Sequence, residues 1–412
     1  MTSFVLIGKS KGIAWPVLQA INGFANQKCI LVGDKETSPL RWSSLCKEHL
    51  LIDFDEKDDT YFVNLVNGIN GTKDNESNKI NKEEVILIPY DCQGIRLVNQ
   101  TRNFLKHSII PIPDVQMMNL FEDKWSFYEF CTNNFLSVPY TRFIGSKSNL
   151  NFSAIVSEMG LPFVIKPVMG PNSLSVRIVH NKSQFEDDIQ NNPCYDYGAL
   201  IAQRYIEGVD VGLNLLSVHG KVNAVAMQRL VFSEMHFISN DYLKLATEKI
   251  SGVSSYHGVM NVKARIEKGT GKVFLIESNP CFWATLITSA ECGLNFMHEV
   301  IYLTSPIAPM RQLTSGAADV RHPLFRPASW RSMVFDRSQR GRLLRVRLFD
   351  LYSLGELIEV LLGNALAFIK RQSAFILKTL RIQHMHSQFE VDLNVANSGS
   401  VTAKRVASKA RS

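Results

Sequence analysis

The feature of this sequence that most constrains its fold is a series of four short apolar runs near the N-terminus. They are FVLIG (4–8), KCILVGD (28–34), HLLIDFD (49–55) and VILIPYD (85–91), and segments with helical spacing follow the first and the fourth. Strands that alternate with helices at this spacing predict an open α/β unit with a parallel sheet. Residues 67–84, which are polar and rich in Asn, Gly and Lys, are predicted to form a surface loop.

Two glycines, Gly8 and Gly12, follow the first apolar run and could belong to a nucleotide-binding motif. Gly8 and Gly12 are separated by three residues, and the third glycine of a G-x-G-x-x-G dinucleotide motif is missing. A tight strand-to-helix turn, or one lip of a substrate cleft at the carboxyl ends of the strands, therefore explains this segment better than a dinucleotide site does.

The length and composition are those of a globular chain with two or three domains. The sequence has 412 residues, of which 45% are hydrophobic and 20% are charged. Its seven cysteines are widely spaced with no C-x-x-C pair, so we expect free thiols, mostly packed as small hydrophobic residues. The chain opens with a strand-like run in place of a targeting signal, and we expect it to be cytoplasmic.

The net charge of +7 is concentrated at the C-terminal end. Residues 311–412 hold 17 Lys and Arg against 7 Asp and Glu, whereas residues 1–310 hold 28 against 31. A mildly acidic body with a basic end lacks the basic face and reader fold of a nucleic-acid-binding domain. We therefore expect no nucleic-acid partner.

From about residue 118 the pattern changes to an α+β region. An amphipathic helix is predicted over 121–135 with Asp123 at its cap, and most of the segments that follow are strand-like. A Gly-containing turn at 218–221 predicts a hairpin within 211–231.

Three fragments of this region carry candidate chemistry. The first, VIKPVMGPNSLSV (164–176), places Lys166 at the end of a buried strand before a loop of small residues, which suits polyphosphate binding. The second, LIAQRYIEGVDVGLN (200–214), offers backbone groups around Ile206 to an adenine edge and the Asp210 carboxylate to ribose hydroxyls. Taken singly, each of these fragments is equally explained by an ordinary turn or hairpin with charged surface residues.

The third fragment, VFLIESNPCFWATL (273–286), is the most specific of the three. Glu277 and Asn279 flank Ser278 on an apolar strand, so the period-2 geometry of a strand places both on one face. A carboxylate and an amide oxygen side by side suit Mg²⁺ held together with phosphate oxygens. A buried acid without a partner would be costly, which disfavours a purely structural role.

In this order and spacing the three fragments resemble the ATP-grasp superfamily, and most closely its carbamoyl-phosphate-synthase-like members. The likeness covers about residues 1–305. It implies a Rossmann-like pre-ATP-grasp domain over 1–117, an ATP-grasp domain over 118–305, a basic helical extension over 306–387 and a disordered tail over 388–412.

The resemblance also implies roles for individual residues. Lys124 and Lys166 match the two basic residues that act on the phosphates, and Gly170 to Ser175, including Ser173, match the loop that folds over them. Gln203 to Ile206 match the adenine-contacting hinge, and Asp210 matches the ribose-binding acid. Glu277 and Asn279 match the magnesium ligands.

The activity implied is ATP-dependent ligation, with ATP and Mg²⁺ as cofactors. A small-molecule carboxylate is activated as an acylphosphate and joined to an amine or a similar nucleophile, so carbon–nitrogen bond formation is expected. Two departures from the family pattern support an alternative, a catalytically degenerate ATP-binding regulatory or scaffold module. Lys263 stands where the family has a further metal ligand, and Cys281 stands where it commonly has Arg.

The C-terminal quarter requires a separate explanation. Residues 354–383 are predicted to form one long helix, whose longest uncharged stretch, 360–369, is too short to span a bilayer. The helix is expected either to dock on the body or pair in a dimer, or to lie through 354–381 on an anionic membrane surface. On both interpretations, residues beyond about Tyr302 contribute no group to ATP chemistry.

Overall fold

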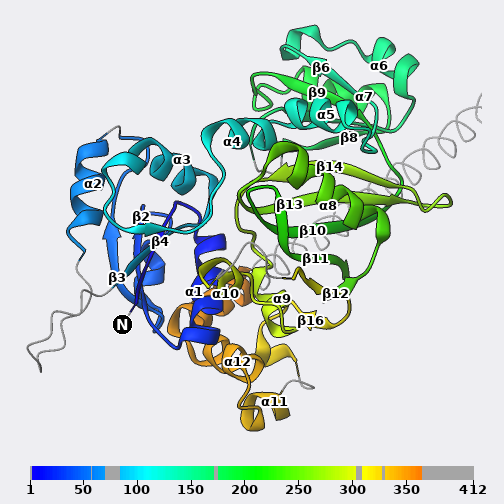
Figure 1. Ribbon diagram of the computed structural model, residues 1–412. Coiled ribbons are helices and arrows are strands. Elements are labelled where there is room, and N and C mark those ends of the chain that lie inside the picture. Colours follow the sequence, from blue (N-terminus) through cyan, green and yellow to red (C-terminus); the bar gives the residue numbers. More distant parts are fainter. Residues whose placement is uncertain are drawn as a thin grey trace, which may run out of the picture. The chain divides into compact units, whose positions relative to one another are not determined.

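A computed structural model describes residues 2–56, 58–69, 84–170, 175–302, 309–326 and 330–363 of this chain (Figure 1). Of Ser332 only the backbone is described. The chain divides into two compact units, residues 1–352 and residues 353–412. Within the second unit, residues 353–363 are helical. Most of the predicted helix 354–383, all of the predicted tail 388–412 and most of the predicted loop 67–84 lie outside the described residues.

The first sheet is the parallel one that the apolar runs predict. Its five strands have the order β3-β2-β1-β4-β5, and every neighbouring pair is parallel. The strands are β1 (Ser3–Ile7), β2 (Cys29–Gly33), β3 (Cys46–Leu51), β4 (Val85–Pro89) and β5 (Ser108–Ile109). The predicted α/β unit is confirmed, and β5, which has only two residues, was too short to predict.

Three helices connect these strands: α1 (Lys11–Ala25), α2 (Asp59–Asn67) and α3 (Cys92–Thr101). Asp58 and Asp91 cap the N-termini of α2 and α3, because their carboxylates accept the N–H groups of Tyr61 and Gly94. These caps stabilise the N-termini of α2 and α3, which lie next to the carboxyl ends of the strands.

The helix predicted over 121–135 is two helices in the structure, α4 (Val115–Glu122) and α5 (Lys124–Asn133). Asp123 separates them because its backbone is extended, with a ψ angle of 118°. Its carboxylate accepts the N–H of Ser126 at 2.7 Å, so the predicted cap is confirmed for α5.

A small antiparallel sheet follows, with strand order β6-β9-β7-β8. Its strands are β6 (Thr141–Ile144), β7 (Phe163–Pro167), β8 (Arg177–Val179) and β9 (Leu200–Arg204), and the helices α6 (Phe152–Met159) and α7 (Lys182–Phe185) lie in the connections. Phe163, Ile165 and Phe185 belong to a separate hydrophobic cluster under this sheet. Lys166 sits at the end of β7, where the sequence placed it.

The large sheet has seven strands, six of them in the order β14-β13-β10-β11-β12-β16, with β15 paired to β11. Five of its strands are β10 (Gly208–Val218), β11 (Lys221–Val231), β12 (Glu234–Ile238), β13 (Gly258–Glu267) and β14 (Val273–Asn279). The predicted hairpin is confirmed, since β10 and β11 pair antiparallel around His219 and Gly220. Helix α8 (Asp241–Ser254) and α5 contribute to the core on one side of this sheet.

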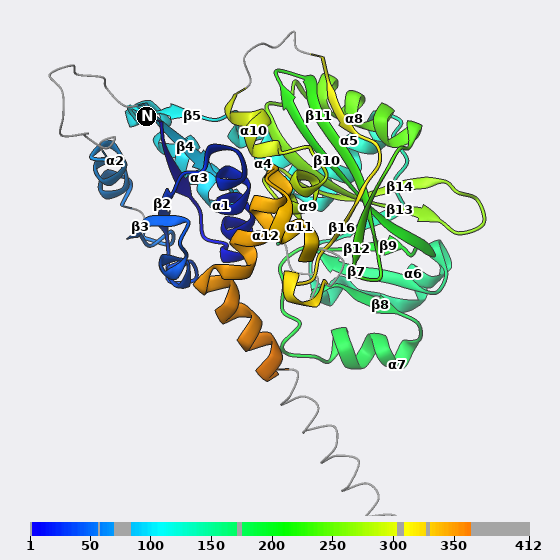
Figure 2. The same cartoon turned by 90° about the horizontal axis from the view of Figure 1, so that it is seen from below.

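Residues after the predicted ATP-grasp region also belong to the large sheet and its surroundings. Strands β15 (Arg311–Leu313) and β16 (Ala317–Asp319) pair with β11 and β12, and neither was predicted. Helices α11 (Trp330–Phe335) and α12 (Gln339–Phe349) follow, and α12 packs against α1 (Figure 2). A Cβ on Gly23 of α1 would lie 2.9 Å from Leu343, so the two helices are in close contact.

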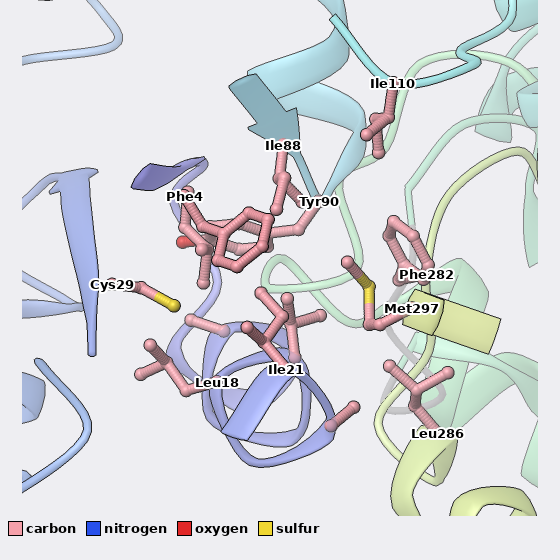
Figure 3. Packing of buried hydrophobic residues seen from close by; sticks show 14 of the residues in the cluster. Phe4, Leu18, Ile21, Cys29, Ile88, Tyr90, Ile110, Phe282, Leu286 and Met297 are labelled. Carbon is pink, nitrogen blue, oxygen red and sulfur yellow. The ribbon is translucent and has the colours of Figure 1, made fainter. Parts of the chain in front are cut away.

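One hydrophobic core joins the parallel sheet to the far side of the large sheet. Helices α9 (Leu286–Glu291) and α10 (Phe296–Ile301) contact α1, and Figure 3 shows Phe282, Leu286 and Met297 facing Leu18, Ile21 and Tyr90. The described residues include no helix that is long and apolar enough to cross a membrane.

A fully buried ion pair ties the C-terminal segment to α9, and it provides a test of this arrangement. The guanidinium of Arg326 lies 3.1 Å from the carboxylate of Glu291, and both side chains are 2% exposed. Glu291→Gln leaves a buried guanidinium without its counter-charge, so we expect a loss of about 3–5 kcal/mol in the free energy of unfolding, measured by urea denaturation.

The matched control is Arg311→Met, which breaks the half-exposed ion pair between Arg311 and Glu299. We expect that change to cost less than about 1 kcal/mol, because solvent screens the pair. Equal effects of the two substitutions would contradict the assignment of residues 309–326 to the folded core.

Candidate active site

A cavity of about 880 Å³ opens between the parallel sheet and the large sheet. The parallel-sheet side contributes Lys9, Ser10 and Asp91, and the large-sheet side contributes residues of β10, β11, β13 and β14. Ligands bind outside the carboxyl ends of the strands in open parallel sheets, and the turns after β1 and β4 lie at that edge. The cavity therefore lies at the carboxyl ends of the strands, where the sequence analysis gave a substrate cleft as one of two alternatives.

Three lysines converge on one carboxylate beside this cavity. The Glu277 carboxylate lies 2.8 Å from the Lys263 ammonium and 4.0 Å from the Lys166 ammonium. Lys263 and Glu277 are directly opposite each other in the antiparallel pairing of β13 and β14. Lys124 lines the same cavity, and its charge influences both Lys166 and Glu277.

Burial and charge shift the pKa values of this cluster. Burial lowers the pKa of Lys166 to about 8, although the Glu277 charge acts to raise it. Burial also lowers the pKa of Lys124. For Glu277, burial acts to raise the pKa, but the charges of Lys166, Lys263 and Lys124 outweigh it and hold that pKa below its usual value. The cluster carries more positive charge than Glu277 can balance, so it suits a polyanion.

Lys124 is held at the entrance to the predicted phosphate loop. It is the first residue of α5, its backbone N–H donates to the Val168 carbonyl at 3.1 Å, and its ammonium donates to the Gly170 carbonyl at 2.8 Å. Ser173 of the predicted loop lies outside the described residues.

The predicted nucleotide hinge, Gln203 to Ile206, lies at the end of β9 and in the loop that follows, and the predicted ribose-binding Asp210 lies on β10. Gln203 is buried and donates its amide N–H to the Thr141 hydroxyl at 2.9 Å, and Ile206 is buried after the strand. Asp210 lines the cavity with an exposed side chain that pairs with Arg265 at 3.0 Å. Neither Gln203 nor Ile206 is among the described residues that line the cavity.

Glu277, Ser278 and Asn279 all line the cavity, and the Ser278 hydroxyl donates to the Phe121 carbonyl at 2.6 Å. Magnesium takes six oxygen ligands, and these two side chains supply only part of that set. Across the described residues, no three His, Cys, Asp or Glu side chains gather in a way that could hold a metal ion. Since Lys263 also occupies the Glu277 carboxylate, the residues fit a Mg²⁺ ion that arrives on a nucleotide, and they do not fit a resident ion.

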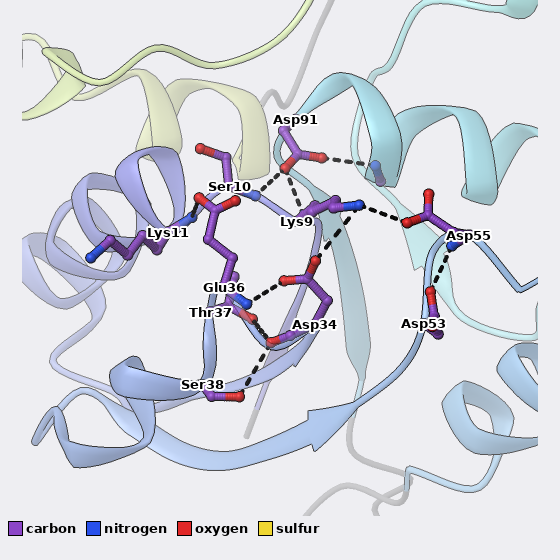
Figure 4. Close-up of polar contacts among 11 residues, drawn as sticks. Lys9, Ser10, Lys11, Asp34, Glu36, Thr37, Ser38, Asp53, Asp55 and Asp91 are labelled. Atoms are coloured by element: carbon purple, nitrogen blue, oxygen red, sulfur yellow. Dashed lines mark hydrogen bonds and ion pairs between the residues drawn. The ribbon is translucent and has the colours of Figure 1, made fainter.

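The turn after β1 is organised by Asp91. This buried carboxylate accepts the backbone N–H groups of Lys9 and Ser10, both at 2.7 Å, and that of Gly94 at 2.8 Å (Figure 4). The two amides that lead into α1, which an anionic ligand would otherwise use, are thus already bonded. The expectation of a tight turn, with no dinucleotide site, agrees with this arrangement.

Two cavity residues with free polar atoms were not singled out from the sequence as hydrogen-bonding groups. The Gln228 amide donates to the Thr285 hydroxyl at 2.9 Å, which leaves its buried Oε1 without a partner. The indole Nε1 of Trp283 is likewise buried without a partner. Ile13, Met235 and Phe282 also line the cavity, so its lining combines apolar side chains with one free acceptor and one free donor. Strand periodicity does not predict that the Gln228 oxygen and the Trp283 indole are buried without partners.

Comparisons with known proteins agree with the sequence resemblance. Residues 121–285 match the family of the ATP-grasp domain. A D-alanine–D-alanine ligase from Cupriavidus pinatubonensis is 26% identical over 123 residues, which are 29% of this chain and 37% of that relative. The match therefore spans little more than a third of the relative's length.

Two solved structures show the same fold. N5-carboxyaminoimidazole ribonucleotide synthetase in complex with ADP has a TM-score of 0.56 at 12% identity, covering 76% of this chain and 79% of that one. An L-amino acid ligase from Bacillus licheniformis has a TM-score of 0.50 at 13% identity, with 73% of each chain covered. Residues 121–285 are thus an ATP-grasp domain, and the predicted fold class is confirmed.

Proposed function

We propose that this chain, which carries an ATP-grasp domain, is an ATP-dependent ligase that joins a small-molecule carboxylate to an amine or a similar nucleophile. The observation that carries the proposal is the convergence of Lys124, Lys166 and Lys263 on Glu277 beside an 880 Å³ cavity. Preorganised ammonium groups stabilise the charge that develops during phosphoryl transfer. The relatives' names, ligases and a synthetase, support the same reaction class.

In the proposed reaction the substrate carboxylate attacks the γ-phosphate of ATP and forms an acylphosphate, with ADP as the leaving group. The amine then attacks the acyl carbon and releases phosphate. Lys124 and Lys166 hold the phosphates, together with the loop from Gly170 to Ser175. Glu277 and Asn279 would hold Mg²⁺ that arrives with ATP, and the ion would neutralise further phosphate charge. Gln203, Ile206 and Asp210 hold the adenine and ribose.

The substrates are proposed to bind in the cavity beside Gln228 and Trp283. The Gln228 oxygen accepts a hydrogen bond from an N–H of the substrate, and the Trp283 indole donates one to a substrate oxygen. A ligand that left either buried atom unpaired would lose affinity, because an unsatisfied buried polar group costs about 1–3 kcal/mol. These two atoms favour substrates that carry both a donor and an acceptor.

A second candidate function is favoured by the ion pair between Lys263 and Glu277. An ammonium bound directly to the principal oxygen donor suits an ATP-binding module that has lost catalysis. Single-turnover release of phosphate from ATP separates the two candidates, because a degenerate module binds ATP without consuming it. The experiment uses the full chain with a mixture of amino acids as candidate substrates.

The first test of the proposal is stabilisation by Mg·ATP. A ligand at 100 times its Kd adds about 2.7 kcal/mol to the stability of the folded state, so the melting temperature rises with Mg·ATP. Lys166→Ala and Glu277→Ala are each expected to abolish most of the shift in a thermal-shift assay. Ser148→Ala, at an exposed position near β6, is the control and keeps it. An unchanged melting temperature for the unmodified protein at millimolar Mg·ATP would contradict nucleotide binding.

The second test uses the lowered pKa of Lys166. In the ATP-free protein this ammonium loses its proton near pH 8, and a polyanion binds best to the charged form. We expect the Kd for ATP to be lowest below pH 8 and to increase by up to about tenfold per pH unit above it. Calorimetric titration at several pH values measures the slope. Lys166→Arg keeps its charge throughout this range, and a slope unchanged in that variant would assign the effect to another group.

The third test concerns Lys263 and the magnesium requirement. Because Lys263 competes for the Glu277 carboxylate, we expect Lys263→Gln to lower the Mg²⁺ concentration needed for half of the ATP-induced thermal shift. Mg²⁺ is titrated at a fixed ATP concentration, with Lys268→Gln as the control, since Lys268 pairs with the exposed Glu207. A higher Mg²⁺ requirement in Lys263→Gln would reverse the argument.

A further inference from the structure

Two thiols from distant parts of the sequence meet at the wall of the cavity. The sulfur atoms of Cys92 and Cys281, which are 189 residues apart in sequence, lie 3.5 Å from each other. Cys92 is the first residue of α3, at the edge of the parallel sheet, and Cys281 belongs to the loop between β14 and α9. Both line the cavity, where Cys92 is partly exposed and Cys281 is buried, so Cys92 is the thiol that a small reagent in the cavity meets first.

The backbone around this pair is already held together. The N–H of Phe282 donates to the Tyr90 carbonyl at 3.3 Å, one residue from Cys281 and two from Cys92. Asp91, between Tyr90 and Cys92, is fixed by its three backbone hydrogen bonds. Figure 3 shows Tyr90 and Phe282 on the two sides of this junction. A disulfide needs a sulfur separation of about 2.05 Å, so the sulfur atoms have to approach by about 1.5 Å.

We propose that Cys92 and Cys281 are a modification site at which a reversible disulfide forms and links the parallel-sheet domain to the β14–α9 loop. The oxidant is a low-molecular-weight disulfide of the glutathione class. One thiolate attacks it, forms a mixed disulfide and releases the first small thiol. The second cysteine then attacks the mixed disulfide and releases the other, so two protein thiols are oxidised while one small disulfide is reduced to two thiols.

The bond has a direct consequence for the cavity. Cys281 is two residues after Asn279 and two before Trp283, and all three line the cavity. A covalent link between Cys281 and α3 restricts any separation of the two cavity walls. This consequence rests on the proposed function, whereas formation of the bond does not.

The other cysteines provide internal comparisons. Cys29 and Cys46 are opposite each other on β2 and β3, and both are buried away from the cavity. Cys194 is exposed and is the thiol best placed to react with a second molecule. We therefore use Cys194→Ser as the background for the experiment, which removes this source of intermolecular disulfides.

The experiment treats the full chain in the Cys194→Ser background with oxidised glutathione, alkylates the remaining thiols and maps the disulfides by mass spectrometry. We expect a Cys92–Cys281 cross-link, loss of alkylation at both residues and full recovery of alkylation after dithiothreitol. Cys92→Ser and Cys281→Ser each eliminate the cross-link. Full alkylation of Cys92 and Cys281 after oxidation, or a cross-link between other cysteines only, overturns the proposal.

A second measurement separates this proposal from the proposed function. The oxidised protein is expected to melt at a higher temperature than the reduced protein without any ligand, since a cross-link restricts the unfolded chain. That shift is absent in Cys281→Ser. ATP-dependent phosphate release is expected to fall on oxidation and to return with dithiothreitol. A cross-linked protein that never releases phosphate in either state contradicts the ligase function and leaves the disulfide intact.

Discussion

Burial of the Lys166 ammonium is the constraint on which the rest of the site depends. A charge removed from water is costly unless it is paired and hydrogen-bonded, and Lys166 is 2% exposed. Its compensation comes from one strand, β14, through the Ile276 carbonyl at 3.4 Å and the Glu277 carboxylate at 4.0 Å. The small sheet, which carries Lys166, and the large sheet are therefore coupled by charge, and this coupling sets one wall of the cavity.

The same carboxylate acts on all three lysines of the cluster. Glu277 serves Lys166, Lys263 and Lys124 together, so one negative charge is shared among three ammonium groups. On the proposed function, the phosphate oxygens of ATP supply further negative charge to these ammonium groups. The pairing of Lys263 with Glu277 follows from strand register, since the two residues are opposite each other on β13 and β14.

Sequence periodicity predicted the parts of this protein that depend on local pattern. The buried parallel strands were predicted from continuous apolar runs, and the β10–β11 hairpin was predicted from the Gly-containing turn at 218–221. The periodicity predicted one helix over 121–135 and missed α4, because Asp123 both ends α4 and caps α5. The meeting of Cys92 with Cys281 and the unpaired atoms of Gln228 and Trp283 depend on contacts between distant segments, which no local pattern contains.

The basic C-terminal quarter shows how charge composition and structural role can diverge. None of the described residues that line the cavity comes from beyond Thr285. Yet β15 and β16 extend the large sheet, Arg326 balances the buried Glu291, and the Asp350 carboxylate accepts from the Ser44 N–H at 2.7 Å. Removal of everything after Tyr302 would expose two strand edges and leave Glu291 as an unpaired buried charge. Residues 309–352 are therefore part of the folded unit, and a separate role as a partner or membrane surface is left to the residues that follow them.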